Sequence, residues 1–176
     1  MKHADGGFRQ SVNVQWATDA DSQMIVDVAV TNAGSDLGLA APMHEHVTQR
    51  TGVTPKDDLI DGGFTKHDDI DPRDHAGTRV IAPVPKPKDQ HREPHLPRPG
   101  DSPAVAAWRI RMGDEAVKVL SHLRAATAAC VNAVFRNRGM RAFTVRGLDK
   151  SYACTFWQVL AHNRMRAAVL RAPATA

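Results

Sequence analysis

The sequence predicts a mixed α/β fold in which helices pack on a sheet. Three observations predict it. Two segments with strand character lie at residues 11–18 and 24–31, a helical pattern separates two short apolar segments at 58–61 and 78–82, and long helical patterns follow residue 102. The chain has 176 residues, of which 42% are hydrophobic, enough to form the core of a single domain.

The first two strands should form an antiparallel hairpin. Polar and apolar residues alternate over 11–18, as in a half-buried strand, and residues 24–31 are rich in β-branched side chains. The segment between them, 19–22, has turn composition. A helix should follow from Ser35 or Asp36 to about Arg50.

The middle of the chain predicts a parallel crossover. A strand at 58–61, a helix from residue 65 or 66 to 76 and a strand at 78–82 have the order of a βαβ unit. Residues 83–103 then hold seven of the eleven prolines, so we expect a long, basic, extended loop. Such a loop either has a function or is a spacer.

The last third should be helical. Ser102 and Pro103 are typical of a helix start, one long helix should run from Asp114 to about Asn137, and another from Asp149 to about Leu170. A short extended segment is expected at 142–145. The expected inward-facing residues are Val119, Leu123, Ala126, Cys130 and Val134 on the first long helix, and Phe156, Val159, Leu160 and Ala167 on the second.

Charge is distributed unevenly. Residues 1–76 contain 6 Lys or Arg and 13 Asp or Glu, whereas residues 77–176 contain 17 and 6. This asymmetry favours a polyanion-binding surface beside a carboxylate site, although uneven surface charge without function is the alternative. No apolar run is long enough to span a membrane, and no apolar signal region opens the chain. The two cysteines lie in helical patterns and suit a reducing compartment. We therefore expect a cytoplasmic protein with free thiols.

Asp61 is the candidate metal-binding and catalytic residue. It follows an apolar strand and precedes two glycines, and ligands gather at the carboxyl ends of strands in α/β sheets. The alternative is a solvated turn aspartate. The six other aspartates between 57 and 74 are expected to be solvated. His44 and His46 should point apart on a helix, and no zinc-site spacing is present.

A basic segment near the C-terminus is the candidate DNA-binding surface. Nine Lys or Arg residues and a single acid, Asp149, lie between residues 124 and 171. Guanidinium groups bind phosphate in a bidentate manner. A solvated basic face is the alternative. The candidate DNA-binding residues are Arg124, Arg136, Arg138, Arg141, Arg146 and Lys150.

Several short motifs, in this order and spacing, resemble the DDE transposases of bacterial insertion sequences over nearly the whole chain. They are Val12-Asn13-Val14-Gln15, Val26 to Asn32, Asp36, Pro42-Met43, Asp61-Gly62-Gly63-Phe64, Arg136-Asn137-Arg138-Gly139, Arg146-Gly147-Leu148 and Ala161-His162-Asn163. The resemblance implies a ribonuclease-H-like mixed sheet flanked by helices, with two long C-terminal helices. It also implies two Mg²⁺ or Mn²⁺ ions, held by two aspartates and a glutamate, for DNA cleavage and strand transfer.

Two departures from the family pattern bear on activity. Asp61 matches the second aspartate, but no strand before Phe8 offers the first, and Asp5 lacks an apolar run. Ala129 stands where the glutamate is expected, and Glu115 is too far along the helix to replace it. Residues 1–176 are therefore expected to form one incomplete catalytic domain, lacking its first strand and most of its activity.

Three functions remain open from the sequence. The first is a truncated or decayed DDE transposase that binds DNA. The second is a non-catalytic DNA-binding remnant that self-associates or pairs with an intact transposase. The third is an unrelated metal-dependent nuclease that uses Asp61 with other acids of the 57–74 segment, such as Asp69.

Overall fold

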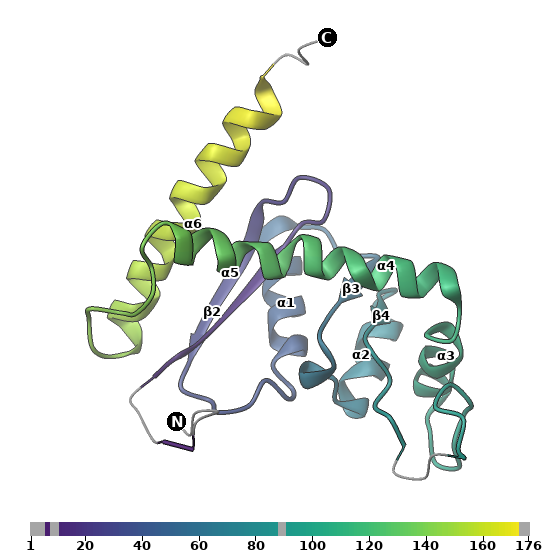
Figure 1. Cartoon of the computed structure of the whole chain (residues 1–176). Helices are drawn as coiled ribbons and strands as arrows, with labels where there is room; N and C mark the ends of the chain where they lie inside the picture. Colours follow the sequence, from purple (N-terminus) through teal and green to yellow (C-terminus); the bar gives the residue numbers. More distant parts are fainter. Residues whose placement is uncertain (1–5, 8–10, 88–90, 173–176) are drawn as a thin grey trace. The chain divides into compact units, whose positions relative to one another are not determined.

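The chain folds into two compact units, each with its own two-stranded sheet (Figure 1). The computed structural model describes residues 6–7, 11–87 and 91–172. The hairpin unit contains the described residues up to 34 and those from 126 onwards, and the crossover unit contains those from 35 to 125. The chain is mixed α/β, as predicted.

The hairpin unit is built on the predicted pair of strands. Strands β1 (Asn13–Thr18) and β2 (Ile25–Thr31) are antiparallel, with Trp16 opposite Val28. In the turn, the Asp19 carboxylate accepts a hydrogen bond from the backbone N–H of Ser22, at 2.8 Å. The hairpin prediction is therefore confirmed, including its turn.

Two helices cover this hairpin and complete its core. They are α5 (Ala128–Asn137) and α6 (Leu148–Arg171). The buried apolar side chains come from both strands and helices: Ile25, Val28, Val131, Phe135 and Val159. The rings of Trp16 and Phe135 meet edge to face, with centroids 4.8 Å apart. A two-stranded hairpin is marginal alone, so these helices supply the surface that it needs.

Polar side chains of α6 bind the backbone at the start of β2. Asn163 accepts a hydrogen bond from the Ile25 N–H (2.9 Å) and donates one to the Ile25 carbonyl (2.8 Å). One turn further along, Arg166 Nε donates to the Ser22 carbonyl (3.0 Å). At this end of the hairpin, these backbone groups have no neighbouring strand as a partner. The side chains of α6 satisfy them instead.

The crossover unit confirms the predicted βαβ arrangement. Strands β3 (Asp57–Leu59) and β4 (Arg79–Ile81) are parallel, with Asp58 opposite Val80. Between them lie short 3₁₀ turns and helix α2 (Ile70–His75). Helix α1 (Ala40–Thr51) precedes them, and α3 (Pro103–Arg111) and α4 (Glu115–Ala126) follow.

Helix α3 forms the core of the crossover unit. Trp108 is fully buried among residues of α2, β4 and α3, and its Nε1 donates to the Ala82 carbonyl at 3.2 Å. As predicted, Ser102 caps α3, and Pro103 is its first residue. Burial raises the pKa of Asp101, but hydrogen bonds from Arg109 and from the Arg98 backbone outweigh it, so the pKa is lower than usual.

Several predicted features differ in the structure. The four strands form two separate sheets among the described residues, where a single sheet was expected. The long helix predicted from Asp114 is divided at Thr127 into α4, which ends at Ala126, and α5, which begins at Ala128. Residues 142–145 form bends and no strand. The loop at 83–102 has no helix or strand in its described part, as predicted, and Asp5 lies outside the described residues.

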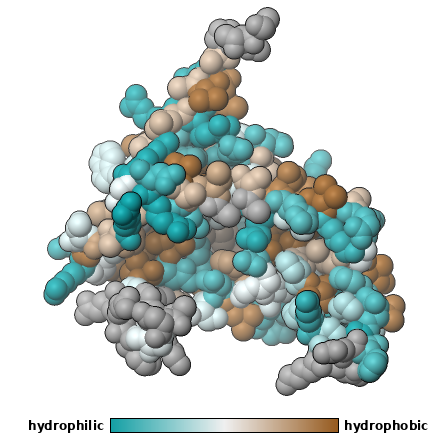
Figure 2. Space-filling model, in the orientation of Figure 1, coloured by the Kyte–Doolittle hydropathy of each residue, from teal (hydrophilic) through white to brown (hydrophobic). Residues whose placement is uncertain are grey.

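The apolar faces predicted for the last helices are partly wrong. Val119, Leu123 and Cys130 are exposed, whereas Val131 and Phe135 are buried. On α6, Val159 is buried as expected, but Phe156 and Leu160 are exposed, and polar residues occupy much of the buried face: Ser151, Thr155 and His162. Figure 2 shows hydrophobic surface on the C-terminal part of α6, at the top of the view. None of the helices in the described ranges is long and apolar enough to cross a bilayer.

The Asn163 contacts predict a specific loss of stability. Asn163→Ala leaves the N–H and carbonyl of the buried residue Ile25 without partners, so the free energy of unfolding should fall by about 2 kcal/mol. Urea unfolding measures this change. Arg164→Ala, at the exposed neighbouring position, is the control and should change stability by less than about 0.5 kcal/mol. Equal stability of the two variants would contradict the role of Asn163.

Candidate functional site

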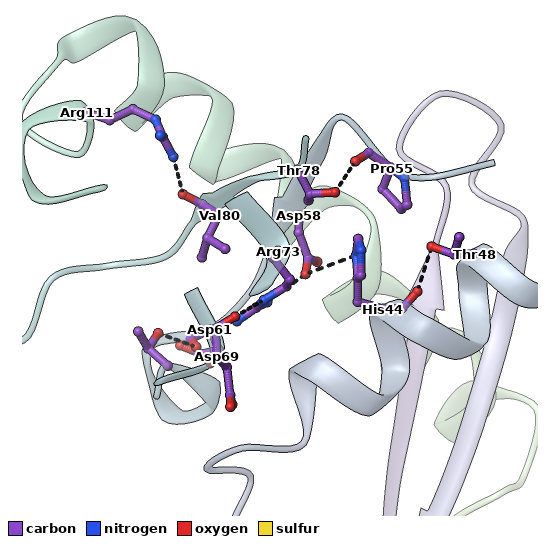
Figure 3. Close-up of polar contacts among 11 residues, drawn as sticks. His44, Thr48, Pro55, Asp58, Asp61, Asp69, Arg73, Thr78, Val80 and Arg111 are labelled. Carbon is purple, nitrogen blue, oxygen red and sulfur yellow. Dashed lines mark hydrogen bonds and ion pairs between the residues drawn. The ribbon is translucent and has the colours of Figure 1, made fainter. Parts of the chain in front are cut away.

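Asp61 lies two residues beyond β3, at the exit of the parallel pair. Pairing continues past the strand, because the Ile60 N–H donates to the Ile81 carbonyl at 3.0 Å. Asp61, labelled in Figure 3, then precedes the 3₁₀ turn Gly62–Phe64. Its Oδ1 accepts a hydrogen bond from the Gly62 N–H at 2.7 Å. Asp61 therefore lies just past the end of the strand, close to the predicted position. It begins a turn that its own carboxylate stabilises.

Arg124 of α4 faces the same carboxylate. Its terminal nitrogen Nη1 lies 3.6 Å from Asp61 Oδ2, so two residues that the sequence analysis assigned to different roles form an ion pair. The Asp61 side chain is 57% exposed and that of Arg124 is 32% exposed. An ion pair this open to solvent contributes at most about 1 kcal/mol. Each carboxylate oxygen of Asp61 thus has a partner, the Gly62 N–H for Oδ1 and the Arg124 guanidinium for Oδ2.

The surroundings of Asp61 do not fit a two-metal centre. Across the part of the chain that the structure describes, no three His, Cys, Asp or Glu side chains are grouped so that they could hold a metal ion. Glu115 is engaged by Lys118 at 2.6 Å, and Ala129, a residue of α5, has no metal ligand in its side chain. Two divalent ions need several shared carboxylates, which this arrangement lacks.

A partly buried polar cluster beside β3 was missed by the sequence analysis. Asp58 Oδ2 accepts a 2.8 Å hydrogen bond from Nη1 of Arg73, a side chain that is only 2% exposed (Figure 3). Arg73 Nε also donates to the Asp69 carbonyl, at 2.9 Å. Removing one partner of a buried pair typically costs about 3–5 kcal/mol. The cluster therefore anchors α2 to β3.

The prediction that the acids of 57–74 are solvated is right for two of them and wrong for four. Asp68 and Asp74 are exposed, whereas Asp57, Asp58, Asp69 and Asp71 are partly buried. Asp57 binds Arg79 through both oxygens (2.7 and 2.8 Å), and the hydrogen bond raises the pKa of Arg79. Asp71 accepts a hydrogen bond from the Ser102 hydroxyl at 2.6 Å. Each acid of β3 pairs with an arginine further along the chain, Asp58 with Arg73 and Asp57 with Arg79. These two arginines were the signal in the sequence that could have indicated the ion pairs.

His44 completes the cluster from α1. It is 8% exposed, and its Nδ1 lies 4.0 Å from Asp58 Oδ2. Burial lowers the pKa of His44, and the opposing effect of Asp58 does not restore it, so the imidazole is neutral at pH 7. His46 is exposed, which confirms that the two histidines point apart.

Five of the six candidate DNA-binding residues gather around the connection between α5 and α6 in the hairpin unit. All five are exposed, and within the described ranges none of them forms an ion pair: Arg136, Arg138, Arg141, Arg146 and Lys150. The sixth, Arg124, belongs to the crossover unit. Teal side chains at the left edge of Figure 2 lie over this connection. We call these five residues the basic corner.

The geometry of the basic corner follows from its glycines and helix ends. Gly139 (φ 91°) ends α5, and Gly147 (φ 90°) precedes α6, so the chain reverses within ten residues. Positive φ values are accessible to glycine at little cost. From residue 126 to the end of the chain there are eight Lys or Arg residues and one acid. A surface of this kind attracts polyanions.

The buried state of His44 predicts a pH effect on stability. Because its folded pKa is lower than the unfolded value of 6.5, the unfolded chain binds the proton first as pH falls. Stability should therefore decrease from pH 6.5 downwards, until the folded pKa is reached. In His44→Gln this decrease should be smaller, as measured by thermal unfolding at pH 7.5 and 5.5. His46→Gln is the control and should keep the wild-type pH slope, while an unchanged slope in His44→Gln would refute the assignment.

The chain matches no protein-family model, no curated protein and no solved structure. Its function is therefore inferred from the described side chains. Those side chains present two distinct features, a cationic surface on the hairpin unit and an ion-paired aspartate on the crossover unit.

Proposed function

We propose that this protein binds DNA through the basic corner of the hairpin unit. The observation that carries the proposal is the gathering of five exposed Lys and Arg side chains, without ion pairs among the described residues, at one helix connection. Cations that serve only to solvate a helical face are usually interspersed with acids. Here Asp149 is the single acid between residues 126 and 172.

The chemistry of the corner suits a phosphate backbone. Four of its five cations are arginines, whose planar guanidinium groups make bidentate contacts with phosphate oxygens. Each phosphate that is neutralised releases counterions, so affinity should depend strongly on salt. No side chain of the corner indicates which base sequence is read.

We further propose that the chain is of the DDE transposase type, with a ribonuclease-H-like ancestry, and that it acts without catalysis of its own. The order of its motifs supports the first part. The second part is supported by the ion-paired state of Asp61 and by Ala129 at the position of the expected glutamate. The geometry gives less support to an independent nuclease, because no three His, Cys, Asp or Glu side chains of the described residues are grouped so that they could hold a metal ion.

A protein partner is part of the same proposal. Strand β1 pairs with β2 alone among the described residues, so its outer edge has no strand beside it. Unpaired edges favour association by strand addition. Self-association, or pairing with an intact transposase, would use this edge.

Salt dependence tests the DNA-binding proposal. The double variant Arg141→Ala/Arg146→Ala should bind duplex DNA more weakly, and the slope of log K against log salt should become shallower by about 2. Fluorescence anisotropy with a labelled duplex measures both. The charge-matched control, Arg164→Ala/Arg171→Ala, removes two exposed arginines of α6 outside the corner and should keep the wild-type slope. Equal slopes for the two double variants would refute the assignment to the corner.

Plasmid nicking tests the proposed absence of catalysis. With Mg²⁺ or Mn²⁺, the purified protein should convert supercoiled plasmid no faster than buffer does, because the described residues hold no group of three ligands that could bind a metal ion. Asp61→Asn is the matched control and should behave identically. Metal-dependent nicking that disappears in Asp61→Asn would show that the chain is an active enzyme.

A further inference from the structure

The outer face of helix α6 carries a line of exposed side chains that continues beyond the basic corner. Lys150, Trp157, Arg164 and Arg171 follow one another at intervals of seven residues. Seven residues make almost two turns of an α-helix, so the four side chains lie along one side of α6, over about 30 Å of its length. All four are exposed, and they belong to the helix labelled α6 in Figure 1.

This line lies opposite the face by which α6 packs on its own unit. The packed face is formed by Ser151, Thr155, Val159 and His162, all of which are buried. Trp157 is two residues from both Thr155 and Val159, which places it about 200° around the helix from each of them. The line is therefore directed away from the core of the hairpin unit, and packing within that unit does not explain the residues found on it.

Trp157 is unusually exposed for a tryptophan. Its exposed fraction is 70%, whereas Trp108 of the crossover unit is fully buried. The residues one turn before and one turn after it are the exposed alanines Ala153 and Ala161, whose methyl groups are too small to cover an indole ring. Leu160, which is 45% exposed, is its neighbour on the same face. An exposed apolar patch that is bordered by polar residues typically marks an interaction site.

The adjacent aromatic residue, Phe156, has a different environment. Its ring stacks on that of Tyr152, with centroids 6.0 Å apart and planes 28° apart. Tyr152 packs in turn against the core of the hairpin unit. In the described part of the chain, Trp157 has neither an aromatic partner nor a hydrogen bond. Its ring is therefore available to a ligand, whereas that of Phe156 already has an intramolecular partner.

The charge along the line selects a polyanion. Helix α6 contains four Lys or Arg residues and one acid, Asp149, in its first turn. Within the described ranges, Lys150, Arg164 and Arg171 form no ion pair. Lys150 precedes Trp157 by about 10 Å along the helix, and Arg164 follows it by the same distance. An aromatic ring thus lies between two exposed cations.

This arrangement suits an unpaired DNA strand better than a second copy of the helix. In a coiled coil, every seventh residue enters the seam and is normally apolar. Three of the four residues on this line are cations, so two copies would bring like charges into one seam. Proteins that bind single strands combine cations for the phosphates with aromatic rings on which bases stack. The bases of a duplex stack on one another, so only an unpaired base can stack on Trp157.

We infer that the outer face of α6 binds single-stranded DNA, with a base stacked on Trp157 and phosphates to either side in contact with Lys150 and Arg164. The inference rests on the proposal that the hairpin unit binds DNA, and it adds an unpaired strand to the duplex assigned to the basic corner. Lys150 belongs to both surfaces, so the two are continuous. Trp157, Arg164 and Arg171 lie outside the corner and are not needed for the duplex.

Fluorescence anisotropy with a labelled oligothymidylate tests the inference, because this strand does not pair with itself. Trp157→Leu should bind it about tenfold more weakly, since leucine keeps an apolar contact but has no ring on which a base can stack. Leucine is also a good helix former, so α6 should persist. Trp157→Phe restores a ring and should recover most of the affinity. Phe156→Leu is the control and should bind the oligothymidylate as the wild type does.

Charge variants separate the two DNA surfaces. In Arg164→Ala/Arg171→Ala, the slope of log K against log salt for the oligothymidylate should become shallower by about 1.4, at about 0.7 for each phosphate contact. The same variant should keep the wild-type slope for duplex DNA, and Trp157→Leu should keep the wild-type duplex affinity. The thermal unfolding midpoint of each variant shows whether it is folded.

The two proposals fail in different ways. Wild-type protein that binds duplex but no oligothymidylate, or a folded Trp157→Leu with wild-type affinity for oligothymidylate, would overturn the inference and leave the basic corner intact. A dimer that dissociates in Trp157→Leu, with oligothymidylate affinity unchanged, would assign the face to a second copy and also overturn it. Binding to neither DNA would contradict the proposed function as well.

Discussion

The hairpin unit depends on the pair of hydrogen bonds between Asn163 and the backbone of Ile25. A two-stranded sheet cannot bury both of its faces or pair its outer edges, so it needs a partner that supplies apolar and polar contacts together. Helix α6 supplies both, since Val159 enters the core and Asn163, one turn later, binds the strand backbone. Lys150 of the basic corner lies on the same helix.

Charged residues of the crossover unit have a structural role that composition alone does not reveal. The acidic segment 57–74 could have formed a cation site, but its acids are distributed among separate arginines and a serine. The Asp58 carboxylate accepts a hydrogen bond from Arg73, that of Asp57 from Arg79, and that of Asp71 from the Ser102 hydroxyl. These contacts tie β3 to α2 and to β4, and they tie α2 to the start of α3. With the acids distributed in this way, no group of three potential ligands is found among the described residues.

Local patterns predicted the elements well and the packing less well. The alternation in 11–18, the cap at Ser102 and the glycines at 52 and 77 act over a few residues, and the hairpin, the start of α3 and the crossover follow from them. The other starts were predicted too early: α1 was expected from Ser35 or Asp36 and begins at Ala40, and α2 was expected from residue 65 or 66 and begins at Ile70. The inward face of α6 could not be predicted by hydrophobicity. Ser151, Thr155 and His162 are buried because their polar atoms bond to backbone carbonyls, while Trp157 is 70% exposed.

The candidate site shows the same division between local and long-range information. The sequence predicted that Asp61 would follow a strand, which is a local property, and the structure has it at that place. It did not predict Arg124 as the neighbour of Asp61, because the two residues are 63 positions apart and only the fold brings them together. A guanidinium 3.6 Å from a carboxylate already supplies the positive charge that a metal ion would otherwise bring. In that environment Asp61 is suited to an ion pair that joins α4 to the turn after β3, a structural role that needs no metal ion.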